Sequence, residues 1–83
     1  MNYYVYIIST KRKKKKIFYT GYTNNLNKRI SLHNSGKGAK FTRGNFWKLV
    51  YKKKFIKKKE ALIYEHFLKK NRLFKYKLVK KKK

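Results

Sequence analysis

Apolar and aromatic residues gather in two short runs near the N-terminus of the chain. The first run covers residues 3–8 and the second covers residues 17–22, and both are rich in tyrosine and isoleucine or phenylalanine. Because β-branched and aromatic residues are enriched in strands, each run predicts a strand. The basic segment 11–16 separates the runs, so the sequence predicts a hairpin with this segment as its loop.

A helical periodicity follows the predicted hairpin. Leu26, Ile30 and His33 recur at i, i+4 and i+7, which places them on one face of a helix. Residues 23–25 are threonine and two asparagines, which are favourable N-cap residues. We expect this helix to end near Gly36, because glycine readily adopts the left-handed conformation found at helix C-termini.

The second half of the chain predicts one more strand and two helices. A loop at 36–44 leads to a strand at 46–55, whose apolar bulk comes from Phe46, Leu49 and Val50. A helix at 57–70 and a short helix at 73–79 complete the chain. The predicted order is therefore β-β-α-β-α-α, that of a small α+β domain.

The length of the chain limits it to one folded unit. With 83 residues, of which 41% are hydrophobic, it has room for a single core and enough apolar bulk to avoid disorder. We expect a single domain over 1–79 and a frayed basic tail at 80–83. The chain has no cysteine and no run approaching the roughly 18 apolar residues of a membrane span, so we expect a soluble, cytoplasmic protein without disulfides.

The charge is strongly positive. Twenty-seven lysines and arginines face two acids, which gives a net charge of +25. Clustered cations favour a nucleic-acid partner, because binding them releases counterions from the phosphates. The excess of lysine over arginine is also what an AT-rich genome would produce by codon bias. The charge thus favours a polyanionic partner but leaves open how much of it reflects composition alone.

Glu65 is the most informative residue of the predicted helix 57–70. It shares a helical face with the apolar Ala61, Leu62 and Leu68, and a carboxylate there needs a cation, a hydrogen-bond network or a metal. A salt bridge to a lysine, or exposure at the edge of the helix, would explain it equally well. The other acid, Glu60, lies near the helix start, where a negative charge suits the helix dipole.

Two further pairs of residues have both structural and chemical interpretations. Arg29 and His33 lie four apart on one helical face; they could clamp a phosphate and relay a proton, or simply decorate the surface. Tyr6 and Tyr19 lie on the two strands of the predicted hairpin. They could be ordinary core residues, or their hydroxyls could converge on a cleft.

Several classes of enzyme are excluded by what the sequence lacks. There is no phosphate-binding GxxxxGK[ST] loop and no HExxH motif, and aspartate is absent. Two acids are too few for a two-metal carboxylate nuclease. Any bound metal would be a single hard cation that keeps most of its water ligands.

Taken in order along the chain, these residues resemble the GIY-YIG nuclease family. Tyr4-Val5-Tyr6 corresponds to the first family motif and Tyr19-Thr20-Gly21 to the second. The family arginine usually lies ten residues beyond the second motif's tyrosine and the histidine four further, which matches Arg29 and His33.

Longer segments strengthen the resemblance, which runs from about residue 3 to residue 73. Residues 33–44 and 60–65 resemble small stand-alone bacterial members, the UPF0213-like branch, with Glu65 in the metal-ligand position. The sequence departs from the motif letters at Tyr4, Val5 and Thr20. An asparagine present in some family members has no match here.

The resemblance implies a three-stranded antiparallel sheet flanked by helices, and a one-metal hydrolysis of phosphodiester bonds. Glu65 would hold Mg²⁺ or Mn²⁺, and Tyr6 or Tyr19 would activate water. His33 would help remove or relay the proton, and Arg29 would neutralise charge on the scissile phosphate. We also expect the loop 36–44 to contact nucleic acid, DNA rather than RNA, through four residues: Lys37, Lys40, Thr42 and Arg43.

These features predict a structure-selective, metal-dependent endonuclease, since a single small domain has little surface for reading bases. One alternative is a basic nucleic-acid-binding protein that keeps the nuclease scaffold without catalysis. Another is a ribosome-associated or purely structural basic protein. Catalysis requires the side chains of Tyr6, Tyr19, Arg29, His33 and Glu65 to meet on one concave surface, which the structural alternative does not. Salt-sensitive binding without cleavage would favour the binding protein.

Overall fold

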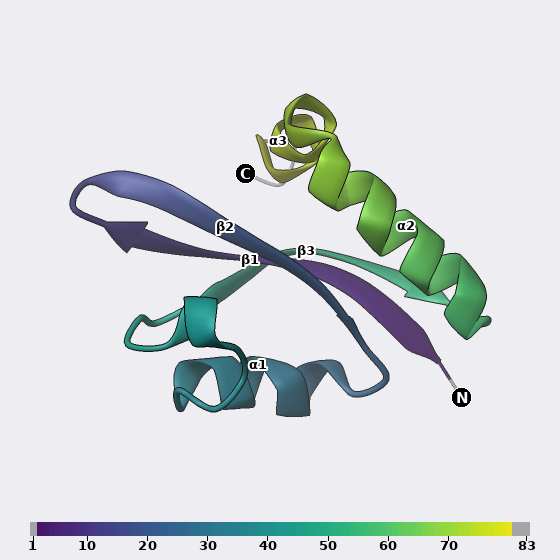
Figure 1. The fold of residues 1–83 in the computed structure, drawn as a ribbon, viewed down its shortest axis with the longest axis horizontal. Helices are drawn as coiled ribbons and strands as arrows, with labels where there is room; N and C mark the ends of the chain where they lie inside the picture. Colours follow the sequence, from purple (N-terminus) through teal and green to yellow (C-terminus); the bar gives the residue numbers. More distant parts are fainter. Residues whose placement is uncertain (1, 81–83) are drawn as a thin grey trace.

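The computed structural model describes residues 2–80, which form one sheet between two layers of helix (Figure 1). Strands β1 (Tyr3–Arg12) and β2 (Lys15–Thr23) form an antiparallel hairpin. Strand β3 (Lys48–Phe55) pairs antiparallel with the other edge of β1, so the order is β2-β1-β3. The three-stranded antiparallel sheet and the order β-β-α-β-α-α are confirmed.

The hairpin is longer than the sequence predicted, because the ladder continues into the basic segment 11–16. Lys11 pairs with Lys16 and Arg12 with Lys15, which leaves only Lys13 and Lys14 in the turn. Both turn residues have positive φ, 50° and 68°. A two-residue turn with positive φ at both positions matches the twist of the strands it joins, so pairing overrides the local preference of charged residues for a loop.

Helix α1 (Leu26–Asn34) begins and ends close to the predicted positions. The side chain of the N-cap residue Asn25 accepts a hydrogen bond from the backbone N–H of Lys28 at 3.2 Å. Gly36 follows the helix with φ +83°. The predicted loop 36–44 contains a short 3₁₀ helix, η1 (Lys40–Thr42), which the sequence did not predict.

Helices α2 (Lys58–Lys70) and α3 (Arg72–Lys80) cover the opposite face of the sheet from α1 (Figure 1). Lys80 belongs to α3 and not to a frayed tail, and the rest of the predicted tail, 81–83, lies outside the described residues. Within residues 2–80, no helix combines the length and apolar character that crossing a membrane requires.

Each face of the sheet has its own core. Along β1, Val5 and Ile7 point to the α2 layer and pack with Ala61 and Leu68, all fully buried. The alternate residues Tyr6 and Ile8 point to the α1 layer and pack with Trp47. The prediction that Phe46 and Leu49 supply core bulk is wrong, since they are 69% and 37% exposed, whereas the intervening Trp47 is 1% exposed. A shift of one position exchanges the inward and outward side chains of an extended segment.

Candidate active site

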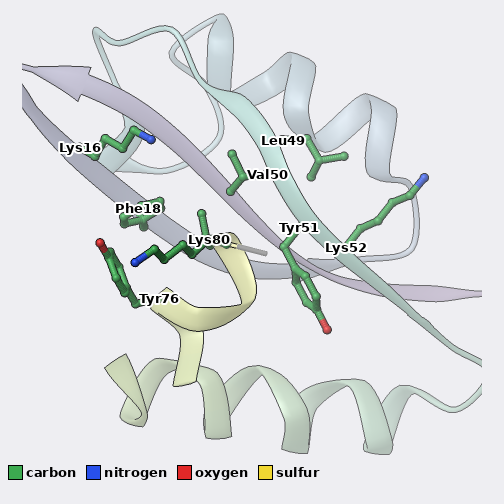
Figure 2. Close-up of a pocket in the computed structure, with 9 residues that line it drawn as sticks. Lys16, Phe18, Leu49, Val50, Tyr51, Lys52, Tyr76 and Lys80 are labelled. Carbon is green, nitrogen blue, oxygen red and sulfur yellow. The ribbon is translucent and has the colours of Figure 1, made fainter. Parts of the chain in front are cut away.

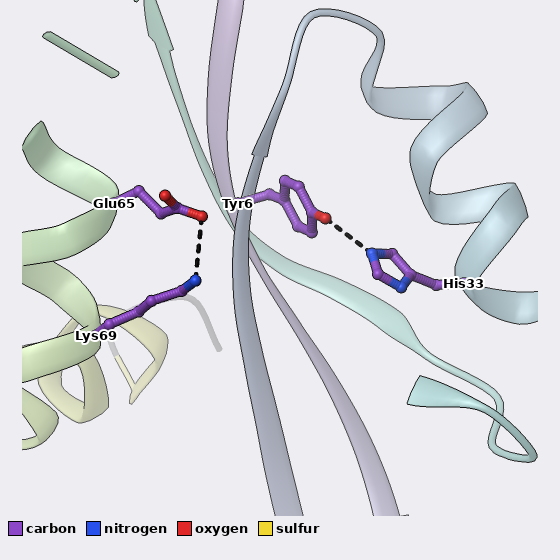
Figure 3. A network of polar contacts seen from close by, with 4 residues as sticks. All are labelled: Tyr6, His33, Glu65 and Lys69. Carbon is purple, nitrogen blue, oxygen red and sulfur yellow. Dashed lines mark hydrogen bonds and ion pairs between the residues drawn. The ribbon is translucent and has the colours of Figure 1, made fainter. Parts of the chain in front are cut away.

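The centre of the candidate site is a hydrogen bond between β1 and α1. The Tyr6 hydroxyl lies 2.8 Å from Nε2 of His33, and Figure 3 shows the two rings meeting on the α1 side of the sheet. Both side chains are buried, with 2% and 1% of their surface exposed. Tyr6 is brought there by the strand alternation and His33 by its place in the last turn of α1.

A second hydrogen bond decides which nitrogen of His33 carries the proton. Thr42 Oγ1 lies 2.8 Å from Nδ1 of His33. The single hydroxyl proton of Thr42 is donated to the carbonyl of Ala39 at 3.0 Å, so Oγ1 must accept from Nδ1–H. Nε2 is then unprotonated and accepts the hydrogen bond donated by Tyr6. This arrangement suits a neutral imidazole with its lone pair aimed at the phenol, which is the form that the lowered pKa of the buried His33 favours.

Thr42 was predicted to contact nucleic acid, and the structure places it elsewhere. Its side chain is fully buried, and its carbonyl accepts a hydrogen bond from the indole N–H of Trp47 at 2.8 Å. Because the Thr42 hydroxyl already takes part in three hydrogen bonds, to His33 and to the backbone of Ala39, we assign it to the support of His33 and not to a contact with phosphate. Lys37, Lys40 and Arg43 are at least partly exposed, as a contact with nucleic acid requires.

Two glycines let the backbone approach these rings closely. A Cβ atom on Gly21, the partner of Tyr6 across the β1–β2 ladder, would lie 2.5 Å from the Tyr6 hydroxyl oxygen. A Cβ atom on Gly38 would collide with Nδ1 of His33 and lie 2.9 Å from its Cα. Any larger residue at either position would displace the phenol or the imidazole. The Gly38 contact escaped the sequence because only the folded loop brings it to α1.

Tyr19 joins the same group of aromatic rings. It points to the same face as Tyr6, and its ring meets His33 edge-on, with centroids 5.0 Å apart. Unlike Tyr6, Tyr19 is only partly buried. The structure therefore brings Tyr6 and Tyr19 together with His33, and Tyr6 is at the same time part of the buried core, so both interpretations that the sequence left open apply to it.

Arg29 lies one turn before His33 on α1 and is half-buried. Within residues 2–80 its guanidinium has no hydrogen-bonded or ion-paired partner, so its donors are free for an anion. Burial lowers the pKa of His33, and the charge of Arg29 lowers it further. Burial raises the pKa of Tyr6, and Tyr19 adds to this effect, while the charge of Arg29 acts in the opposite direction.

Glu65 lies on α2, across the sheet from α1 (Figure 3). Its side chain is 16% exposed and forms an ion pair with Lys69 at 3.3 Å. Its negative charge adds to the rise in the Tyr6 pKa, after burial and Tyr19. The carboxylate therefore acts on the phenol electrostatically, although it belongs to the other helical layer. Residues 2–80 contain no cluster of three or more potential metal-ligating His, Cys, Asp or Glu side chains.

A cavity between α3 and the sheet lies away from these residues. Figure 2 shows this cavity, of about 430 Å³, between α3 and the sheet, with Phe18, Val50 and Tyr76 in its lining. None of the five predicted site residues lines it. The candidate chemistry therefore rests on the hydrogen-bonded residues beneath α1 and not on this cavity.

Comparison with known proteins places these observations in a family. The family model of the GIY-YIG catalytic domain matches residues 2–77. A UPF0213 protein of Oceanobacillus iheyensis is 48% identical over 68 residues, which cover 81% of this chain and 76% of that protein. A UPF0213 protein of Clostridium perfringens is 52% identical over 68 residues, covering 81% and 70%. The solution NMR structure of a UPF0213 protein from Bacillus halodurans is 43% identical, with a TM-score of 0.56 over 99% of this chain and 86% of that one.

Proposed function

The chain belongs to the GIY-YIG family, whose members are generally endonucleases, and on this premise we propose that it hydrolyses nucleic-acid phosphodiester bonds. The observation that carries the proposal is the hydrogen-bonded line from Tyr6 through His33 to Thr42. It connects a phenol to a neutral imidazole, which can take up a proton near neutral pH. In this proposal the reaction takes place around the Tyr6 hydroxyl, which lies between His33 on α1 and Glu65 on α2 (Figure 3).

The proton of the attacking water would follow this line. As the water oxygen bonds to phosphorus, its proton passes to the Tyr6 oxygen, while the phenol's own proton passes to Nε2 of His33. The imidazolium so formed keeps its Nδ1–H bond to Thr42. A buried phenol is a weak acid, and the unprotonated imidazole at 2.8 Å compensates for this. Tyr19 is the more exposed phenol, and we assign to it the orientation of the water.

Arg29 would neutralise the charge that builds on the phosphate oxygens. Its planar guanidinium can donate two parallel hydrogen bonds to a phosphate, and no protein group within residues 2–80 competes for them. Because the side chain is half-buried, the interaction is less screened by solvent than one at an exposed lysine. Groups of this kind typically contribute about 10²- to 10³-fold to a rate.

Glu65 is the residue that would hold a divalent cation. A lone carboxylate suits a hard ion such as Mg²⁺ or Mn²⁺ that keeps most of its water, and the half-exposed Lys69 can leave the carboxylate when a stronger cation competes. The residues present therefore fit one hydrated ion. When bound, such an ion supplies Lewis-acid polarisation of the phosphate and stabilises the leaving oxygen.

DNA is the substrate we favour, cut at a particular structure instead of a particular sequence. The net charge of +25 supports a polyanionic partner, and Lys37, Lys40 and Arg43 lie in the loop next to the site. Contacts of this kind position a backbone without reading bases.

The test is a nicking assay on plasmid and branched DNA with Mg²⁺ or Mn²⁺. We expect Arg29→Ala and Glu65→Ala to lose about 10²-fold or more of the cleavage rate. The exposed Arg72→Ala and Glu60→Ala variants are matched controls and should cleave like the wild type. Equal activity in all four purified variants would reveal a contaminating nuclease and refute the proposal. Salt-sensitive binding without cleavage at any metal concentration would favour the non-catalytic binding protein.

A further inference from the structure

Phe41 is an exposed aromatic residue next to the candidate site. It lies in η1 with 55% of its surface exposed, although full burial of a phenylalanine is worth about 1.5–3 kcal/mol. Its ring is stacked on Tyr19, with centroids 6.1 Å apart and planes at 23°, and it also leans on Trp47 at 6.1 Å. Phe41 therefore extends the aromatic group around Tyr19 to the surface of the protein.

The position of this ring is fixed by buried hydrogen bonds on the next residue. The Thr42 hydroxyl is bonded to His33, and its carbonyl accepts from the indole of Trp47. The backbone that carries Phe41 is thus tied both to α1 and to the segment before β3. A ring held in this way loses little conformational freedom on binding a ligand.

The surroundings of Phe41 decide what kind of ligand suits it. Lys40 and Arg43 flank it and are exposed, and Lys37 lies in the same loop. A second copy of a chain with a net charge of +25 would be repelled from this surface. A flat apolar ring bordered by cations suits a planar group joined to a phosphate, which is the chemistry of a nucleotide.

We propose that Phe41 is a stacking platform for an unpaired nucleobase next to the phosphate that is cut. A base within a continuous duplex is stacked on its neighbours and reaches Phe41 only after unstacking, which costs a few kcal/mol. The platform therefore makes the site prefer single-stranded, frayed or branched DNA over continuous duplex. The inference rests on the proposed function only in placing the base beside the cleavage point.

The test measures binding in the absence of divalent metal, so that it does not depend on cleavage. Single-stranded DNA carrying one 2-aminopurine is titrated with wild type, Phe41→Leu and Phe41→Trp at fixed salt, and continuous duplex is titrated in parallel. Tyr76→Leu is the matched control, because Tyr76 is 56% exposed on α3, across the sheet.

We expect Phe41→Leu to lose about 5- to 100-fold in single-strand affinity, together with the quenching of 2-aminopurine, since a base–aromatic stack is worth that factor. Phe41→Trp should restore both, and Tyr76→Leu should change neither. Duplex affinity should change less than about twofold in every variant, because it depends on the cations. Unchanged single-strand binding and quenching in Phe41→Leu, or an equal loss of duplex binding, would overturn the inference. Stacking without cleavage under any condition would instead refute the proposed function alone.

Discussion

Each face of the sheet holds a hydrogen-bonded tyrosine, and the two bonds have the same length but chemically different acceptors. On the α1 face, Tyr6 is hydrogen-bonded at 2.8 Å to His33. On the α2 face, Tyr64 is hydrogen-bonded at the same distance to the hydroxyl of Tyr51. Burial raises the pKa of both Tyr6 and Tyr64. Only Tyr6 faces a group that takes a proton near neutral pH, so the acceptor distinguishes the candidate site from a stabilising contact.

The buried threonines show the same contrast. Thr42, on the α1 side, uses its hydroxyl to hold His33 and the backbone of Ala39. Thr20 is 3% exposed and faces the other layer, and its hydroxyl has no hydrogen-bond partner among residues 2–80. The α1 face uses its buried polar groups to fix one imidazole, whereas the α2 face is held mainly by apolar packing.

Crowding Tyr6 should give the largest effect. In Gly21→Ala the new methyl group would lie 2.5 Å from the Tyr6 oxygen, so the phenol must move away from its position at His33. We expect cleavage to be lost and stability to fall by about 1–3 kcal/mol, as for an overpacked core. Cleavage rates and chemical denaturation measure the two effects.

Gly44→Ala is the matched control for that variant. Gly44 has φ +82°, and a Cβ atom added there would have no heavy atom within 4 Å, so its substitution adds backbone strain of about 1–2 kcal/mol without touching the site. It should cleave like the wild type at a temperature where both variants are folded. Equal cleavage by Gly21→Ala would show that the position of Tyr6 is immaterial.

Substitutions of the two buried threonines, Thr42 and Thr20, should change stability in opposite directions or by very different amounts. Thr42→Val removes a hydroxyl that serves three hydrogen bonds and should destabilise the protein by about 1–3 kcal/mol. Thr20→Val removes an unpaired buried hydroxyl and should be neutral or stabilising by about 1 kcal/mol. Both changes keep a β-branched side chain of the same size. Chemical denaturation measures both changes. A similar loss of stability in Thr42→Val and Thr20→Val would contradict the different use of buried polar groups on the two faces.

The pH dependence of stability should report the neutral state of His33. Burial lowers its pKa in the folded protein below the value of about 6.5 expected in the unfolded chain. Around and below that pH the unfolded chain therefore binds more protons than the folded protein. The free energy of unfolding keeps its full value above about pH 6.5 and falls as the pH decreases. The loss is about 1.4 kcal/mol for each unit of pKa difference.

Urea denaturation between about pH 8 and about pH 5.5 at fixed ionic strength measures this slope. The range lies above the usual pKa values of carboxylates, so that carboxylate titration stays outside it. His33→Gln should flatten it, whereas His66→Gln should retain it, because His66 is exposed on α2. A wild-type curve that stays flat over this range would mean that His33 is not held in its neutral form.

The sequence predicted the part of the site that depends on local spacing. The strand pattern placed Tyr6 and Tyr19 on the two strands of one hairpin, and the i, i+4 relation placed Arg29 beside His33. The family resemblance supplied their order along the chain. The local pattern left open whether the two tyrosines pack in the core or meet at a site, and it was the resemblance that implied a common site with His33.

Contacts made by the loop after α1 could not be predicted in the same way. The roles of Thr42 and Gly38 depend on a loop that folds back onto His33, and no periodic pattern encodes such a contact. Trp47 was missed because it lies just before β3, where one position decides which side chain enters the core. Glu65 as a metal ligand stays a prediction, since the structure shows its carboxylate paired with Lys69.

The most direct test of the account compares nicking by Tyr6→Phe and Tyr64→Phe. Each variant removes one hydroxyl from a 2.8 Å hydrogen bond, which is buried for Tyr6 and partly buried for Tyr64, and each should lose about 1 kcal/mol of stability. We predict that Tyr6→Phe loses about 10²- to 10⁴-fold of the metal-dependent cleavage rate, while Tyr64→Phe cleaves like the wild type. Equal cleavage by the two variants would contradict the assignment of proton transfer to the line from Tyr6 to His33.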